Sequence, residues 1–189
     1  MRLFVVILSL FPTLSFAIDK TGHNLHIAYE ITKIHKEGIP RDSLLSESYV
    51  DSWEHLLYPS AIGYSYYPSI FWGFKSSYSL AFGSLDGDEG YIDVRSESLK
   101  FGGVVRQPWR WLLPYIEVGV NSFQLKASQG STNESDRGIK PYVGLGASAF
   151  MPIFNTGHEF ELGFEYSYQP YTRGYYVSSI STKISYHFF

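Results

Sequence analysis

The final ten residues of the chain, 180–189, alternate between apolar and polar side chains. The even positions include Ile180, Ile184, Tyr186 and Phe188, and the odd positions include Ser181, Lys183, Ser185 and His187. A repeat of two is the repeat of a β-strand, because successive side chains of a strand point to opposite faces. We therefore predict a strand in this segment with one apolar face and one polar face.

Seven earlier segments alternate in the same way, so we predict eight strands. The seven are Asn24–Ile34, Pro59–Tyr67, Phe71–Gly83, Tyr91–Arg106, Leu113–Lys126, Ile139–Met151 and His158–Gln169. Four connections, at 35–58, 84–90, 127–138 and 170–174, are rich in Gly, Asp and Ser, and three short ones, at 68–70, 107–112 and 152–157, carry Pro or Asn. This alternation of long and short connections predicts antiparallel strands in an up-and-down order. The start of the first strand and the end of the last strand then lie on the side of the short connections.

The aromatic content indicates which solvent such a barrel faces. The chain has 16 Tyr, 14 Phe and 4 Trp, together 18% of its residues, yet 17% of its residues are charged. A membrane barrel accommodates both, since apolar side chains face lipid, polar ones fill the interior and aromatic rings form belts at the interfaces. We predict an all-β fold, an eight-stranded antiparallel up-and-down transmembrane β-barrel.

The N-terminal residues predict export. Met1 and Arg2 form a short basic region, an apolar stretch follows from Leu3 to Leu14, and Ala17 supplies a small residue for cleavage. This is the pattern of a secretory signal peptide, so we predict a signal peptide at 1–17 and the barrel at 18–189. The net charge of −3 argues against nucleic-acid binding, and the absence of cysteine excludes disulfides and thiolate metal sites. We expect no cofactor and no metal.

Strand parity predicts a charged interior. The inward positions include Glu30, Lys75, Lys100, Glu117, Lys140, Glu161, Glu165 and Lys183. An eight-stranded barrel is just wide enough for side chains to fill, and buried charges need partners, so we expect these residues to pair as a polar plug. Glycines on the same face would make room for them. The alternative, a carboxylate pair for acid/base chemistry, is less favoured because so narrow a lumen admits no large substrate.

In the strand at 91–106, the face that is apolar near one end carries charged residues near the other. Asp93 and Arg95 share the parity of Leu99 and Phe101. Either the strand rises above the hydrocarbon at this point, which we favour, or a bulge exchanges its two faces.

The external connections are the remaining place for function. The first is the longest, and its apolar residues over 43–57 are near helical spacing, which predicts a short amphipathic helix on the rim, in reach of lipopolysaccharide or a host surface. A loop folded over the barrel mouth explains the same residues equally well. Asp86–Glu89 lacks the spaced ligands of a calcium loop, so we expect a solvated turn there.

Three motifs resemble a known superfamily: Pro114–Val120, Pro141–Gly146 and the aromatic ending Tyr186, Phe188 and Phe189. They are similar to the small eight-stranded outer-membrane barrels of the outer-membrane protein X/Ail and outer-membrane protein A membrane-domain type. The resemblance implies a monomer in the outer membrane of a Gram-negative bacterium, in contact with its lipid and lipopolysaccharide. It also implies that the ending is an assembly signal for the barrel-assembly machinery and periplasmic chaperones. The implied roles are envelope integrity or interaction with a host surface ligand, without enzymatic activity.

Two alternatives stay open. The chain also resembles lipid A deacylases, but Glu165-Tyr166-Ser167 stands where their His-x-Ser motif is expected, so Ser167 lacks the base that a nucleophile needs. A soluble, lipocalin-like ligand-binding barrel would reverse the two faces, and alternation alone is the same for both arrangements. The aromatic ending favours the membrane barrel. So do Trp72 and Trp109, which lie at strand ends beside the short connections, where a membrane barrel has a belt of aromatic rings.

Overall fold

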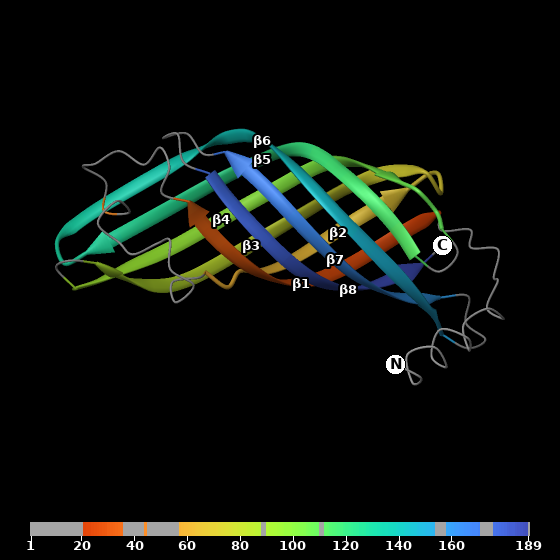
Figure 1. Cartoon of the computed structure of the whole chain (residues 1–189), viewed down its shortest axis with the longest axis horizontal. Coiled ribbons are helices and arrows are strands. Elements are labelled where there is room, and N and C mark those ends of the chain that lie inside the picture. The colour runs from red at the N-terminus through yellow and green to blue at the C-terminus, as the bar shows by residue number, and fades with distance from the viewer. Residues whose placement is uncertain are drawn as a thin grey trace, which may run out of the picture.

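The computed structural model describes residues 21–35, 44, 57–87, 90–109, 112–153, 158–170 and 176–188. They form a closed barrel of eight antiparallel strands that pair in sequence order (Figure 1). The strands are β1 (Gly22–His35), β2 (Ser60–Tyr67), β3 (Trp72–Gly87), β4 (Gly90–Arg106), β5 (Leu112–Gln129), β6 (Thr132–Pro152), β7 (Glu159–Pro170) and β8 (Tyr176–Phe188). The predicted fold class is confirmed, whereas the proposed signal peptide lies outside the described residues. No helix among the described residues is long and apolar enough to cross a membrane.

The barrel closes where β8 pairs with β1. The register runs from His23 opposite Phe188 to His35 opposite Tyr176. Every residue between them has a partner on the other strand, so the alternating C-terminal segment is the closing strand of the barrel. The start of β1 and the end of β8 therefore lie at the same end, which we call the terminal end; the opposite end is the external end.

Two hairpins are longer than the sequence predicted. We expected loops at 84–90 and 127–138, but β3 runs to Gly87, β5 runs to Gln129 and β6 begins at Thr132. Gln129 pairs with Thr132 across the two-residue turn Gly130-Ser131, where Gly130 has a φ of 56°. The prediction was wrong because these polar residues lack the alternation of a lipid-facing strand, whereas backbone pairing does not depend on that alternation.

The long hairpins extend the barrel on one side. Ser60, the first residue of β2, pairs with Leu80 of β3, and the outermost β6–β7 pair joins Val143 to Tyr168. Residues 81–87 and 132–142 thus continue past these pairs, together with the matching parts of β4 and β5. We call this four-stranded part of β3–β6 the external sheet; it projects on the left in Figure 1, away from the C-terminus.

The register of the external sheet excludes a bulge in the hairpin that contains β4. Pairing between β3 and β4 is continuous from Trp72 opposite Val105 to Gly87 opposite Gly90. Asp93 and Arg95 therefore face outward, as Leu99 and Phe101 do, and the strand keeps its faces while the outer surface changes from apolar to charged.

The interior has two parts with opposite chemistry. From the terminal end to mid-barrel the buried side chains are mostly polar or charged, and the outward ones are large and apolar. At the external end the interior is an apolar cluster of Ile34, Leu44, Leu57, Ala81, Ile92, Val94, Phe123, Leu125, Ala127 and Val177. The predicted polar plug concerned the inward charges and did not include this apolar core, which is favoured wherever the outer face meets water.

Candidate functional site: a charged lumen

Lys75 is the centre of the luminal charge network. It extends from β3, and its Nζ lies 2.5 Å from Glu117 Oε2 on β5 and 2.5 Å from Glu165 Oε2 on β7. Tyr115 donates its hydroxyl to Glu165 at 2.9 Å, and Tyr142 donates to Glu117. Two carboxylates thus share one ammonium and each receives a phenol, which compensates the loss of water around them.

A second ion pair lies beside the first. Lys183 Nζ of β8 is 3.0 Å from Glu161 Oε1 of β7, and Asn24 of β1 donates to the other oxygen of Glu161 at 2.5 Å. The Lys183 ammonium also lies 4.8 Å from the centre of the Tyr115 ring. Tyr115 therefore contacts members of both ion pairs.

The remaining predicted charges are less tightly joined. Lys100 Nζ is 4.0 Å from Glu30 Oε1 and donates to Ser167 Oγ at 3.4 Å. Lys140 is only half-buried, and no ion pair joins it to another described residue. Seven of the eight predicted charges thus meet in three groups in the lumen, whereas Lys140 stays outside them.

Glycines make room for the long luminal side chains. A Cβ at Gly146 would overlap the Tyr115 ring, one at Gly63 would overlap His26, and one at Gly102 would meet the Tyr142 hydroxyl at 2.7 Å. The inward glycines are therefore part of the packing of the network.

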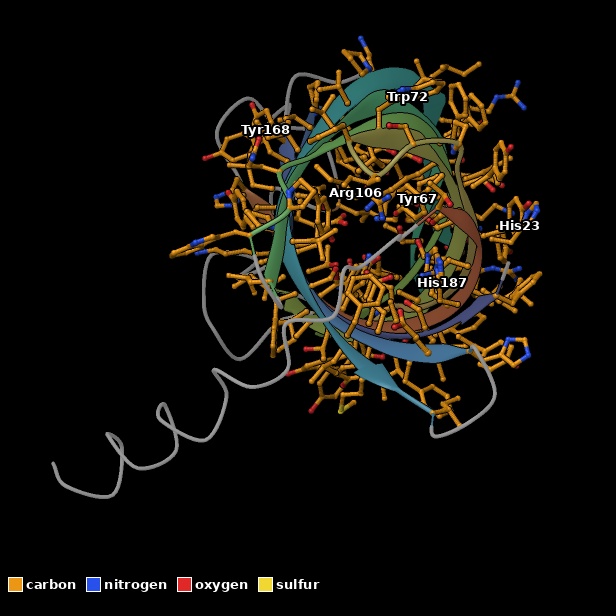
Figure 2. All side chains as sticks on the ribbon, turned by 90° about the vertical axis from the view of Figure 1, so that its right-hand side faces the viewer. His23, Tyr67, Trp72, Arg106, Tyr168 and His187 are labelled. Carbon is orange, nitrogen blue, oxygen red and sulfur yellow. The ribbon has the colours of Figure 1, made fainter. Side chains whose placement is uncertain are left out.

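The lumen is narrow at the level of the ion pairs. A cavity bordered by His26, Lys75 and Lys183 has a volume of about 10 Å³, which is at the lower limit for one water molecule. Towards the terminal end, the Arg106 guanidinium lies 3.6 Å from the centre of the Tyr67 ring, inside the wall (Figure 2), and donates to the Ser69 carbonyl at 3.0 Å. At these two levels charged and aromatic side chains occupy the interior.

The first connection contributes to the closure at the external end. Leu57 is buried in the apolar cluster and exchanges backbone hydrogen bonds with Thr32. Leu44 is buried in the same cluster, and its N–H donates to Glu134 Oε2 of β6 at 2.8 Å. Leu44 is helical, and both Leu44 and Leu57 pack onto the barrel mouth; residues 43 and 45–56 of the expected helix lie outside the described residues.

The serine and the carboxylates that sequence analysis considered for catalysis have lysine neighbours in the lumen. Ser167 is buried, faces inward and has the Lys100 ammonium as its polar neighbour, not a histidine. The carboxylates of Glu117, Glu161 and Glu165 are each bound to a lysine. Among the described residues, no cluster of three or more His, Cys, Asp or Glu could hold a metal ion.

The predicted assembly signal lies at the barrel seam. The Tyr186 ring stacks with that of His158 at 5.4 Å, and the Phe188 ring stacks with that of His23 at 5.5 Å. His23 points away from the barrel in Figure 2. Phe189 lies outside the described residues. These rings thus form part of an aromatic surface at the terminal end.

Sequence reasoning missed several members of the lumen. Tyr115, Tyr142, Asn24 and Arg106 all have inward parity, but the predicted network contained only Lys and Glu. Asn121, also inward, donates to Gln169 across the lumen at 2.7 Å. Their parity was the signal that could have found them, because a neutral polar group on a buried face also needs a partner.

Comparisons with known proteins support the fold. No family model matches the chain, and no curated protein matches it in sequence. The Neisserial surface protein A structure superposes with a TM-score of 0.62 at 13% identity, covering 89% of this chain and 98% of that one. Ail, the attachment invasion locus protein of Yersinia pestis, gives 0.59 at 18% identity, covering 89% and 99%. OprG of Pseudomonas aeruginosa gives 0.52 at 11% identity, covering 90% and 98%. The chain has the fold of the small eight-stranded outer-membrane barrels.

Proposed function

We propose that the chain is a non-enzymatic, monomeric barrel in the outer membrane of a Gram-negative bacterium. The observation that carries this proposal is that the distribution of side chains is the reverse of that in a soluble protein. Ion pairs lie in the interior, while residues such as Ile27, Ile62 and Val118 are about 60% exposed on the outside. Apolar area of this extent is stable only against lipid or another protein. A soluble lipocalin-like barrel would place these residues inside.

The proposed role is interaction at the cell surface through the external sheet. The ion pairs in the middle of the lumen argue against transport, and the external sheet projects beyond the lipid-facing surface. The structural neighbour Ail is an attachment invasion locus protein and has also been solved with the heparin analogue sucrose octasulfate. Contact with the envelope exterior or with a host surface ligand is the role that this geometry supports.

Membrane insertion is tested by electrophoresis of outer-membrane fractions with and without boiling. A folded barrel resists unfolding in the unboiled sample, so we expect two mobilities. A single mobility together with a soluble periplasmic location would contradict the proposal.

The role of the external sheet is tested by shortening the β5–β6 hairpin. Replacing 128–133 by Asn-Gly would join Ala127 to Glu134, which are paired in the structure, through a two-residue turn. We expect lower adhesion of cells to host cells with an unchanged heat-dependent shift. The control replaces only Gly130-Ser131 by Asn-Gly, which keeps the hairpin length and should keep adhesion.

The assembly signal is tested by removing Phe188 and Phe189. We propose that the barrel-assembly machinery and periplasmic chaperones recognise this ending, so the truncated chain should reach the outer membrane in smaller amounts. Unchanged membrane levels would contradict recognition of these residues.

The enzymatic alternative is tested on the lipid itself. We expect identical lipid A masses from cells with and without the chain. A lost acyl chain that returns with Ser167→Ala would establish a deacylase instead.

A further inference from the structure

One carboxylate at the external end is buried without a partner. Asp136 of β6 is 7% exposed, and its Oδ2 atom is shielded from solvent and accepts no hydrogen bond. No hydrogen bond or ion pair joins Asp136 to another described residue. Burying an ionised carboxylate is costly unless the group is paired or coordinates a metal. Asp136 therefore points to a cation that the described residues do not supply.

The inward residues beside Asp136 are apolar. Asp136 lies directly opposite Leu125 of β5, and the next inward residues of β5 are Phe123 and Ala127. All three belong to the apolar cluster at the external end. The inward cation of the same strand, Lys140, is four residues away, which is about 13 Å along a strand, and no ion pair joins it to Asp136. The surrounding interior thus leaves the charge of Asp136 uncompensated.

A second carboxylate lies on the same face of β6. Glu134 is two residues from Asp136, and residues two apart in a strand point the same way, with Cβ atoms about 7 Å apart. Calcium–oxygen bonds of about 2.3–2.6 Å would let one ion join two carboxylates at this spacing. Glu134 Oε2 also accepts the Leu44 N–H at 2.8 Å. A carboxylate has about four acceptor positions, so a hydrogen bond does not prevent it from binding a metal.

β6 has a strand partner on only one side at this level. It pairs with β5 from Thr132 onward, but its pairing with β7 begins at Val143. No described strand therefore lies beside Glu134 and Asp136 on the β7 side. Calcium takes about 6–8 oxygen ligands and accepts water among them. Water on the β7 side could complete the coordination of an ion held by the two carboxylates.

We infer that Glu134 and Asp136 bind a calcium ion at the external end of β6. Sequence analysis predicted no metal, and no group of three or more His, Cys, Asp or Glu among the described residues could hold one. The inferred site is smaller than such a group, with two carboxylates and water. Few protein ligands give weak affinity, so we expect a Kd of about 10⁻⁴–10⁻³ M. Magnesium should bind less well, because it requires a more rigid octahedral set of ligands.

The ion would hold the first connection against the external sheet. Leu44 is buried in the apolar cluster and donates to Glu134, so an ion on Glu134 fixes both β6 and the residue that packs on the barrel mouth. The inference goes beyond the proposed function. It concerns the order of the external end, and it holds whether or not the external sheet binds a host ligand.

Hydrogen exchange tests the site in the full mature chain folded in phosphatidylcholine nanodiscs. The amides of 134–138 are followed in EGTA and in about 10 mM calcium chloride, which is about ten times the weakest expected Kd. A ligand that binds only the closed form slows exchange by a factor of 1 + [L]/Kd, so calcium should slow exchange in the wild type roughly tenfold or more. Calcium should leave exchange in Asp136→Asn unchanged. In EGTA this variant should exchange no faster than the wild type, because it no longer buries an unpaired charge.

Two control variants separate this site from other carboxylates of the external sheet. Asp93→Asn changes an outward group whose Oδ1 accepts the Ser84 hydroxyl at 2.6 Å. Asp86→Asn/Asp88→Asn changes the acidic turn between β3 and β4. Both variants should keep the calcium effect on the same amides. Loss of the effect in either one would place the ion elsewhere and overturn the inference.

The remaining outcomes also decide the inference. Exchange that does not respond to calcium in the wild type would overturn it, as would an equal calcium effect in Asp136→Asn. Faster exchange of Asp136→Asn than of the wild type in EGTA would show that the chain itself satisfies the carboxylate, and would overturn it too. The proposed function fails on different evidence, namely a wild type without a heat-dependent shift or a shortened hairpin that keeps adhesion.

Discussion

The two halves of the barrel interior use opposite chemistry within one continuous sheet. Around Lys75 the interior is made of ion pairs and phenols, and the outward residues are apolar. Around Ile92 the interior is aliphatic and aromatic, and the outward neighbours Tyr91, Asp93 and Arg95 are exposed. The strand pairing passes between the halves without interruption.

The comparison shows that the surroundings of the barrel set the pattern, while the backbone stays the same. In lipid, apolar side chains gain nothing by turning inward, so the narrow lumen is left to polar groups that satisfy one another. In water, burying apolar area is the favourable choice, and the external end is a small core of the soluble kind. The two halves should therefore respond differently to substitution.

The largest expected effect is from Lys75→Met in the luminal half. Glu117 and Glu165 would lose their shared ammonium while still buried, and such unpaired buried charge costs about 3–5 kcal/mol. Urea unfolding in lipid vesicles, followed by Trp fluorescence, measures the loss. The control is Lys140→Met, which removes a half-buried cation without an ion pair to a described residue and should cost less than about 1 kcal/mol. Equal losses would contradict the network.

The next effect is from Ile92→Ala in the external half. Ile92 is fully buried in the apolar cluster, and truncating such a side chain costs about 2–5 kcal/mol. We expect faster hydrogen exchange at the amides of the external sheet than in the luminal half, since the two halves have separate cores. Tyr91→Ala, at a neighbouring side chain that is 74% exposed, should leave exchange nearly unchanged. Uniformly faster exchange throughout would show a single core instead.

Much of the fold was predictable because lipid imposes a strong pattern. The pairing of β8 with β1 and the outward position of Leu99 follow from alternation wherever one face meets hydrocarbon. The extended hairpins were not predictable in the same way, since residues 128–137 carry polar side chains on both faces. The interior changes from polar to apolar side chains near Ile92. Predicting this change requires knowing where along β4 the hydrocarbon layer of the membrane ends.

The candidate site was predictable as a set of residues but not as a set of contacts. The alternation along each strand places Lys75, Glu117 and Glu165 inside the barrel. It does not give their positions along the barrel axis. Those depend on the stagger of eight strands around the barrel, which brings β3, β5 and β7 together at one level. Lys140 shows the consequence, since it has inward parity and is not joined to the other charges.

A smaller effect is expected where glycine makes room in the luminal half. Gly146→Ala would place a methyl group against the Tyr115 ring, and such overpacking costs about 1–3 kcal/mol. Gly103→Ala is the matched change on the outer face of β4, where no atom lies within 4 Å of the added group. The same urea titration should separate the two variants. A loss at Gly103 as large as that at Gly146 would mean that strand conformation, and not luminal packing, sets the requirement for glycine.

The smallest effect is expected for an ion pair on the outside of the external half. Arg95 and Glu97 are 2.5 Å apart, the same separation as Lys75 and Glu117, but their side chains are 49% and 28% exposed against 7% and 1%. Water and salt screen an exposed pair, so Glu97→Gln should cost about 0–1 kcal/mol and less at high salt. Unfolding at two salt concentrations, with Lys75→Met alongside, measures the contrast. If both variants lost similar stability, distance rather than burial would determine the strength of these pairs, and the distinction between the halves would fail.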